Sequence, residues 1–230
     1  MLDAPARPVA SPLPADAPFV FAVWLTETRE EAAELAAAAA GEHVELEAQL
    51  AALARDLLAR RSGGHERDRL RHLDDVLRSD PTVPVSLTHP LVRGEVRRLL
   101  VLQWELKRTC LTAVVAALPP MPRAVFVLHV ILGVDLGRIA AICDTTADAV
   151  KVAWTRASHH VDDYLGARCQ HVEPANFCRC ATRLGVALQQ GFVRYPAHAD
   201  ELPDTPVADA RHHDVVALYR SLPPVRRAAE

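Results

Sequence analysis

The chain has 230 residues, a formal net charge of −3, 50% hydrophobic residues and only 5% aromatic residues. No apolar run approaches the roughly 20 residues that span a bilayer, and the N-terminus lacks the basic start and apolar core of a secretory signal, so we expect a cytoplasmic protein without membrane insertion. Ala, Leu, Arg and Glu are abundant and the alternation typical of strands is missing, which predicts an all-α fold built from small helical modules.

The first 62 residues divide into a tail and a helical hairpin. Residues 1–18 are rich in Pro and Ala with little to bury, and we predict that they are disordered. In residues 19–62 the pattern of apolar residues predicts two helices joined at Gly41. The first extends to Ala40, and the second runs from about Val44 to Arg61. Leucines of the second helix repeat at the spacing of three and four that places them on one face.

Residues 63–88 are predicted to be a linker. They contain a short charged helix that ends near Arg78 and an extended joint at Asp80-Pro81-Thr82-Val83-Pro84. We place the domain boundary there. Thr88 is then predicted to cap a long helix from about Pro90 to Leu118, which opens the next domain, residues 89–166.

The pattern from Leu118 to Tyr164 predicts a helix-turn-helix. Proline fits the first turn of a helix, so Pro120 indicates a start, and Gly133 indicates the end of that helix. A second short helix follows, and Thr146 can cap a third whose inward side is apolar. Its outward side carries the residues that we predict to contact DNA, namely Thr146, Lys151, Thr155, Arg156 and His159.

This segment resembles the C-terminal promoter-binding domain of bacterial RNA polymerase sigma factors of the extracytoplasmic-function type. The residues that carry the resemblance are Leu118-Pro119-Pro120, Arg123, Phe126, Leu128, Gly133, Ile139-Ala140, Ile142, Ala149-Val150-Lys151, Arg156-Ala157 and Leu165. The resemblance implies a sigma domain 4-like helix-turn-helix in residues 89–166 and a shortened sigma domain 2-like hairpin in residues 19–62. It also implies core RNA polymerase and promoter DNA as partners, together with an anti-sigma or helper protein. The implied polymerase contacts are Trp24, Glu34, Leu35 and Arg55.

Residues 167–195 combine a Cys/His-rich extension with a further helix. Cys169, His171, Cys178 and Cys180 are the ligand types of a structural site for one zinc ion, and a similar Cys-rich extension follows the domain in some members of the family. Reduced thiols packed beneath the next helix, another soft metal and redox sensing remain open as alternatives. Cys110 and Cys143 are expected in the core.

Residues 196–230 form a Pro- and Asp-rich tail with one short amphipathic helix through Val215, Val216, Leu218 and Tyr219. Such a tail is either a flexible end or a docking peptide.

Charge is unevenly distributed along the chain. The formal net charge is −6 over residues 1–88, +2 over 89–166, +3 over 167–195 and −2 in the tail. Because phosphate neutralisation supplies most non-specific DNA affinity, this predicts weak DNA binding unless a larger partner helps.

We therefore predict a sigma-like transcription initiation or regulatory protein that is not an enzyme. His159-His160 and His212-His213 are expected on exposed helical faces, without a nearby nucleophile, acidic pair or phosphate-binding glycine loop. Two alternatives stay open. One is a stand-alone DNA-binding regulator with a metal- or redox-responsive segment. The other is a protein-interaction module that has lost DNA reading, consistent with Asp148 and Val152 on the DNA-facing side.

Overall fold

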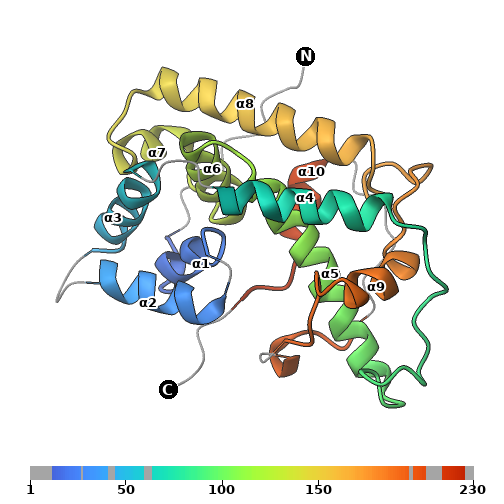
Figure 1. Ribbon diagram of the computed structural model, residues 1–230. Helices are drawn as coiled ribbons and strands as arrows, with labels where there is room; N and C mark the ends of the chain where they lie inside the picture. The colour runs from blue at the N-terminus through green and yellow to red at the C-terminus, as the bar shows by residue number, and fades with distance from the viewer. Residues whose placement is uncertain are drawn as a thin grey trace. The chain divides into compact units, whose positions relative to one another are not determined.

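The computed structural model describes residues 12–26, 28–40, 45–59, 64–196, 199–205 and 214–225. These residues form ten α-helices, a π-helical turn and a 3₁₀ turn, with no strand among them, which confirms the predicted all-α fold (Figure 1). Across the same ranges, no helix combines the length and the apolar character needed to cross a membrane. Contacts between Cα atoms divide the chain into two compact units, residues 1–61 with 120–157 and residues 62–119 with 158–230.

The first unit joins the N-terminal helices to the helix-turn-helix. Helix α3 contacts α1 and α2 on one side and α6 and α7 on another. An ion pair between Glu47 and Arg138 links α3 to α7. The elements of this unit are α1 (Ala17–Val23), α2 (Arg29–Ala39), α3 (Leu46–Ala59), α6 (Pro120–Phe126), the π-helical turn η1 (Val127–Ile131), α7 (Leu136–Ile142) and the first part of α8 (Ala147–Gly166).

The first predicted helix of the hairpin is in fact two helices. A capping box starts α2: the Thr28 hydroxyl accepts a hydrogen bond from the Glu31 amide at 3.1 Å, and the Glu31 carboxylate accepts one from the Thr28 amide at 3.3 Å. The prediction of one continuous helix was wrong because this local capping signal outweighs the apolar periodicity. Helix α1 also begins at Ala17, inside the stretch predicted to be disordered, while residues 1–11 of that stretch lie outside the described residues.

The second unit is arranged around α5, which contacts α4 and α9. Its elements are α4 (Gly64–Arg78), α5 (Val96–Ala116), the last turns of α8, α9 (Cys180–Gln189), the 3₁₀ turn η2 (Ala199–Glu201) and α10 (Val215–Arg220). The predicted boundaries at residues 62, 88 and 166 follow the order of the chain. The contacts instead separate the chain near 61, 119 and 157, because α3 packs on helices that lie far along the sequence.

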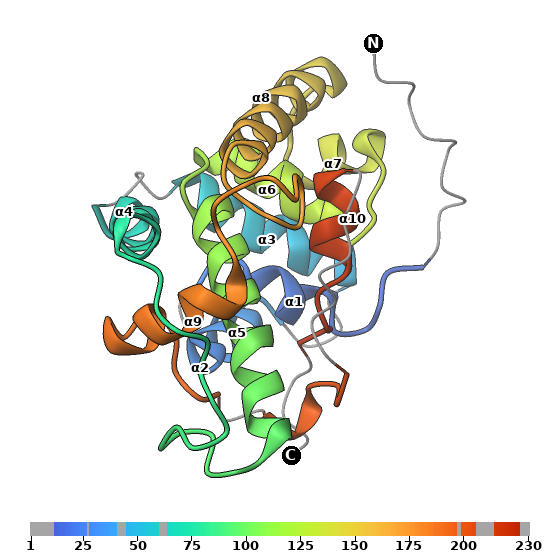
Figure 2. The same ribbon diagram turned by 90° about the vertical axis from the view of Figure 1, so that its right-hand side faces the viewer.

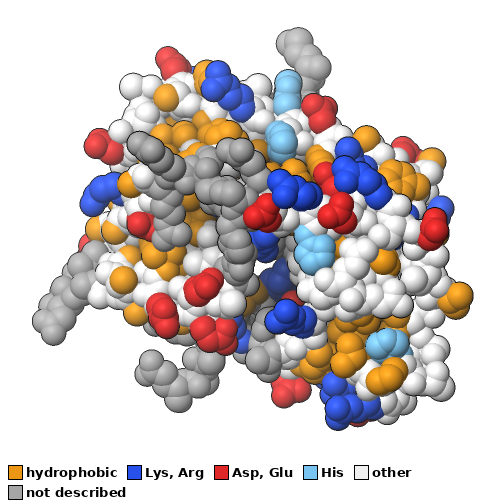
Figure 3. Space-filling view, in the orientation of Figure 1, with side chains coloured by type: hydrophobic (Ala, Val, Ile, Leu, Met, Phe, Trp, Pro, Cys, Tyr) orange, Lys and Arg blue, Asp and Glu red, His pale blue; other side chains and the backbone are white. Residues whose placement is uncertain are grey.

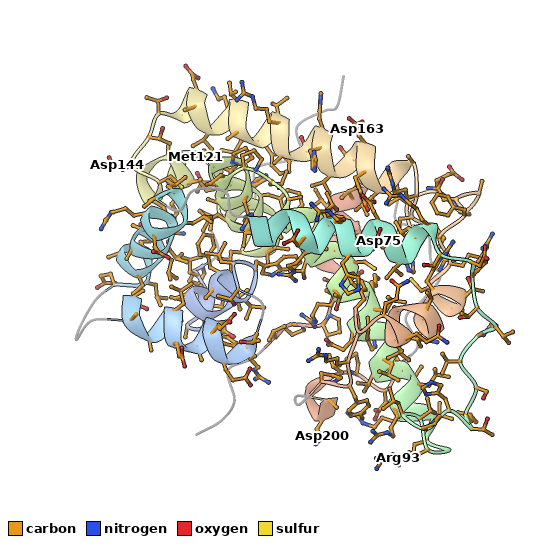
Figure 4. The ribbon with its side chains drawn as sticks, viewed as in Figure 1. Asp75, Arg93, Met121, Asp144, Asp163 and Asp200 are labelled. Carbon is orange, nitrogen blue, oxygen red and sulfur yellow. The ribbon has the colours of Figure 1, made fainter. Side chains whose placement is uncertain are left out.

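Helix α5 starts later than its sequence pattern predicts. Arg93 and Gly94 have φ angles of 54° and 79°, and consecutive left-handed residues cannot continue a right-handed helix. The chain turns tightly there, with the Gly94 amide donating to the Leu87 carbonyl at 2.8 Å (Figure 4 labels Arg93). Thr88 therefore does not cap α5, and its hydroxyl lies 2.7 Å from that of Ser86.

The described parts of the tail dock on one face of α5 (Figure 1, Figure 2). The Trp104 indole donates to the Thr205 carbonyl at 3.1 Å, and the Tyr219 hydroxyl donates to the buried Leu111 carbonyl at 3.0 Å. Arg97 donates to the carbonyls of Ala199 and Leu202 near the start of the helix. Positions 97, 104 and 111 recur every seven residues, so the tail follows a single helical stripe. The predicted helix in the tail is present as α10.

Helix α3 should be essential to the stability of the first unit. Leu53 is 1% exposed, so Leu53→Ala should leave a cavity and lower the free energy of unfolding of that unit by about 2–5 kcal/mol. Leu87→Ala removes the same atoms from a side chain that is 42% exposed and should cost less than about 0.5 kcal/mol. Urea unfolding followed by circular dichroism measures both. Equal costs would contradict the packing of α3 described here.

Candidate functional site

The helix-turn-helix is formed by α6 with η1, α7 and α8. Gly133, with a φ of 69°, ends the first helix, and the Asp135 carboxylate accepts a hydrogen bond from the Arg138 amide at 2.9 Å to start α7. Asp144, labelled in Figure 4, adopts a φ of 48° in the turn between α7 and α8. Thr146 caps α8 as predicted, accepting from the Ala149 amide at 3.2 Å. These local contacts fix the direction in which α8 leaves the turn.

Aromatic packing holds α8 against the first helix. The Trp154 ring stacks on Phe126 at a centroid distance of 6.1 Å and meets His129 edge-on at 4.8 Å. His129 is itself fixed by a hydrogen bond between Nδ1 and the Val134 carbonyl at 2.8 Å. The predicted inward residues of α8 are all buried, namely Val150, Ala153, Ala157 and Val161. The opposite side of α8 is therefore free of packing within the helix-turn-helix.

All residues predicted to contact DNA are exposed on α8 or at its start: Thr146, Lys151, Thr155, Arg156 and His159. Two of them have local contacts, since the Lys151 ammonium lies 3.2 Å from the Asp148 carboxylate and the Thr155 hydroxyl donates to the Lys151 carbonyl. Figure 3 shows basic, acidic and histidine side chains interspersed over α8. An exposed ion pair of this kind contributes less than about 1 kcal/mol, so a phosphate can replace Asp148 as the partner of Lys151.

The predicted polymerase contacts differ in their surroundings. Trp24 is only 6% exposed and belongs to the core of the first unit. Leu35 is half-buried, whereas Glu34 on α2 and Arg55 on α3 are exposed. Glu34 and Arg55 are therefore the two predicted residues that a large partner can reach without repacking the unit.

The Cys-rich segment folds into a loop that brings distant thiols together. Cys169 and Cys178 form an isolated parallel bridge, with the Gln170 amide donating to the Cys178 carbonyl at 3.3 Å and the Cys178 amide donating to the Arg168 carbonyl at 3.2 Å. Residues opposite each other in a bridge project to the same side. The Asn176 amide closes the loop by donating to the carbonyls of Gly166 and Cys169 at 2.8 and 3.1 Å. His171 Nε2 lies 3.3 Å from Cys180 Sγ.

All four predicted metal ligands line one cavity of about 40 Å³ in the second unit. Cys110 of α5, which was expected in the core, lines it too, together with Lys107 and Arg168. Sequence spacing could not reveal Cys110, because some 60 residues separate it from the Cys-rich loop. In the described ranges no three His, Cys, Asp or Glu side chains are already arranged around a metal position, so metal binding requires rotation of side chains within the cavity.

Burial determines the protonation of the thiols and of the Lys107 side chain that line the cavity. It raises the pKa of the Cys178 thiol to about 12 and raises those of Cys169 and Cys110. It also lowers the pKa of the Lys107 ammonium, against the opposing influence of Cys180 and Cys169. The thiols are therefore protonated at neutral pH, and a metal would have to displace their protons. Cys143 is buried as expected, whereas Cys110 has intermediate exposure. Cys143 lies at the end of α7 and does not line this cavity, and burial raises its pKa to about 11.

Comparison with known proteins identifies the helix-turn-helix. Residues 108–160 match the family model described as "Sigma-70, region 4", which covers the end of α5, α6, α7 and most of α8. Neither the curated proteins nor the solved structures include a match to the chain. The matched family is one of non-enzymatic transcription factor domains. Residues 108–160 are therefore similar to sigma-70 region 4, a similarity that implies a DNA-binding, transcription-related role for this segment.

Proposed function

We propose that this protein is a sigma-like transcription factor that binds core RNA polymerase in the cytoplasm and contacts promoter DNA through α8. The observation that carries the proposal is the family match over residues 108–160, which coincides with a helix-turn-helix whose second helix exposes Lys151 and Arg156. An extracytoplasmic-function type, with a shortened N-terminal domain and an anti-sigma or helper protein as regulator, is part of the same proposal.

The charge on α8 favours a function that depends on a larger partner. Its exposed side presents two strong cations, Lys151 and Arg156, and Lys151 is already close to Asp148. Val152 between them is 51% exposed and has no hydrogen-bonding group to offer a base. Each phosphate contact contributes only a modest, salt-dependent share of affinity, so few contacts give weak binding by the isolated protein. Polymerase would supply the missing affinity by presenting α8 to the promoter.

The exposed charges on α2 and α3 provide a direct test of polymerase binding. Exchanging them in the double variant Glu34→Lys with Arg55→Glu should place like charges against the polymerase and weaken co-elution with core enzyme by at least about tenfold, because such a placement costs several kcal/mol. The measurement is size-exclusion chromatography followed by promoter-dependent transcription from the bound fraction.

A matched control reverses two exposed charges on α4, Arg71→Glu with Asp75→Lys, and should leave co-elution unchanged. If the wild-type protein did not bind core enzyme at all but still retained duplex DNA, the stand-alone regulator would replace the present proposal.

DNA contact by α8 is tested through the salt dependence of binding. Lys151→Ala with Arg156→Ala should weaken binding of the polymerase complex to a labelled promoter fragment and reduce the slope of log K against log salt by about 2, roughly one for each phosphate that is no longer neutralised. Fluorescence anisotropy across a salt series measures both quantities. Arg71→Ala with Arg78→Ala on α4 is the control, since both side chains are highly exposed. An unchanged slope in the α8 variant would favour a protein-interaction module that has lost DNA reading.

The Cys-rich loop supports a second part of the proposal, a bound zinc ion. Thiolates and imidazole are the donors that zinc prefers in structural sites, and Cys169, Cys178, Cys180 and His171 surround a common cavity. A structural zinc ion supplies no chemistry to a reaction and instead fixes the backbone that carries its ligands. Here it would fix the loop between α8 and α9.

Removing two thiols should therefore remove the metal. We expect Cys178→Ser with Cys180→Ser to lose one equivalent of zinc after gel filtration under reducing conditions, as measured by plasma mass spectrometry. Cys143→Ser, which removes a buried thiol outside the cavity, should retain it. Wild-type protein that retains no zinc after exposure to it would overturn this part of the proposal and leave packed reduced thiols, another soft metal or redox sensing as the alternatives.

A further inference from the structure

The cavity in the second unit contains a thiol from outside the Cys-rich loop. Cys110 belongs to α5, yet it lines the same cavity as Cys169, Cys178 and Cys180. Burial raises the pKa of the Cys110 thiol, and the three loop thiols raise it further. Four thiols therefore line a space of about 40 Å³, which exceeds the space that one water molecule needs, and rotation of their side chains would be needed to bring them around one ion.

Two cationic residues, Lys107 and Arg168, also line the cavity. The Lys107 side chain is only 3% exposed, and its contacts within the described residues are the Ser221 hydroxyl at 2.8 Å and the Trp104 ring at 5.5 Å. Arg168 lies 4.3 Å above the Tyr164 ring and donates to the Tyr164 carbonyl. None of the described residues that line the cavity is acidic. A buried ammonium is costly without a negative partner, so negative charge on the thiols beside Lys107 would be stabilised.

We propose that Cys110 is the fourth thiolate ligand of the metal ion in this cavity and that Lys107 and Arg168 balance the charge of the resulting complex. This inference rests on the proposed metal site and replaces His171 by Cys110 of α5 as its fourth ligand. A divalent ion with four thiolates carries a charge of −2, whereas a complex with three thiolates and a neutral imidazole carries −1. Because Arg183 acts on Cys178 in addition to Lys107 and Arg168 in the cavity lining, the surrounding positive charge favours the more negative four-sulfur set.

His171 then acts as a positioning residue. Its Nε2 lies 3.3 Å from Cys180 Sγ, and an N–H donated to that sulfur orients the thiolate and stabilises its negative charge. Groups that hydrogen-bond to a ligand in this way tune a metal site without touching the metal. The side chain is 1% exposed, so solvent does not compete for this contact.

The proposed site connects α5 with three later parts of the chain. Cys169 and Cys178 come from the loop, Cys180 begins α9, and Leu218 of α10 lines the same cavity. Lys107, whose charge the metal complex would compensate, also holds the tail through Ser221. Metal binding is therefore expected to stabilise the docked tail, which gives a readout independent of transcription.

The experiment uses Co²⁺ in the full-length protein under reducing conditions, because the near-ultraviolet sulfur-to-cobalt band grows with the number of Co–S bonds. Cys110→Ser should lose one of four such bonds and, since even an outer-shell partner is worth about 10–100-fold in affinity, should bind more than about tenfold more weakly in competition with a chelator. Cys143→Ser is the matched control and should keep the wild-type band and affinity. Cys110→Ala serves the same purpose should the serine variant fail to fold.

Two further variants separate the roles. Lys107→Met should weaken metal affinity while leaving the intensity of the band unchanged, and His171→Asn should keep all four Co–S bonds. A cobalt-bound Cys110→Ser protein with the wild-type band and affinity would overturn the role of Cys110, as would loss of nitrogen coordination in His171→Asn. A wild-type protein without any Co–S band would instead refute the metal site itself.

Trypsin digestion with and without the metal should show metal-dependent protection of the tail in the wild type and weaker protection in Cys110→Ser.

Discussion

The burial of α5 is the constraint on which the second unit depends. This 21-residue helix contacts α4 and α9, while one of its stripes holds the tail through Arg97, Trp104 and the Leu111 carbonyl. Polar side chains on the buried faces of such a helix need hydrogen-bonding or charged partners. Lys107 and Cys110 are the polar side chains of α5 that line the cavity. The same helix ends inside residues 108–160, so the part of the chain that lines the cavity leads directly into the segment that matches sigma-70 region 4.

The helix-turn-helix depends on different forces. Caps at Asp135 and Thr146 define where α7 and α8 begin, and the contact of Trp154 with Phe126 and His129 sets how α8 packs. With its apolar side buried, α8 presents few cations, which suits a domain that contributes orientation and selectivity within a larger complex more than affinity of its own.

Several elements follow directly from local patterns. Pro120, Gly133 and the Thr146 cap predicted the helix-turn-helix, and the apolar spacing in the tail predicted α10, because these signals act within one or two turns. Two local predictions were wrong for equally local reasons. The capping box at Thr28 divides the first helix, and the left-handed pair Arg93 and Gly94 delays α5. Both features interrupt a helix that the apolar spacing predicts to be continuous, and the spacing alone does not reveal them.

The sequence by itself determined the helical fold class, the helix-turn-helix, the exposed basic residues of α8 and the donor chemistry of the Cys-rich loop. Only the tertiary structure decided that α3 packs on α6 and α7, that the tail docks on α5, and that Cys110 and Lys107 face the loop thiols. The physical reason is that helix periodicity shows which face of a helix is buried without identifying the face that covers it. That choice depends on how apolar surfaces far apart in the chain fit together, and only the folded structure reveals it.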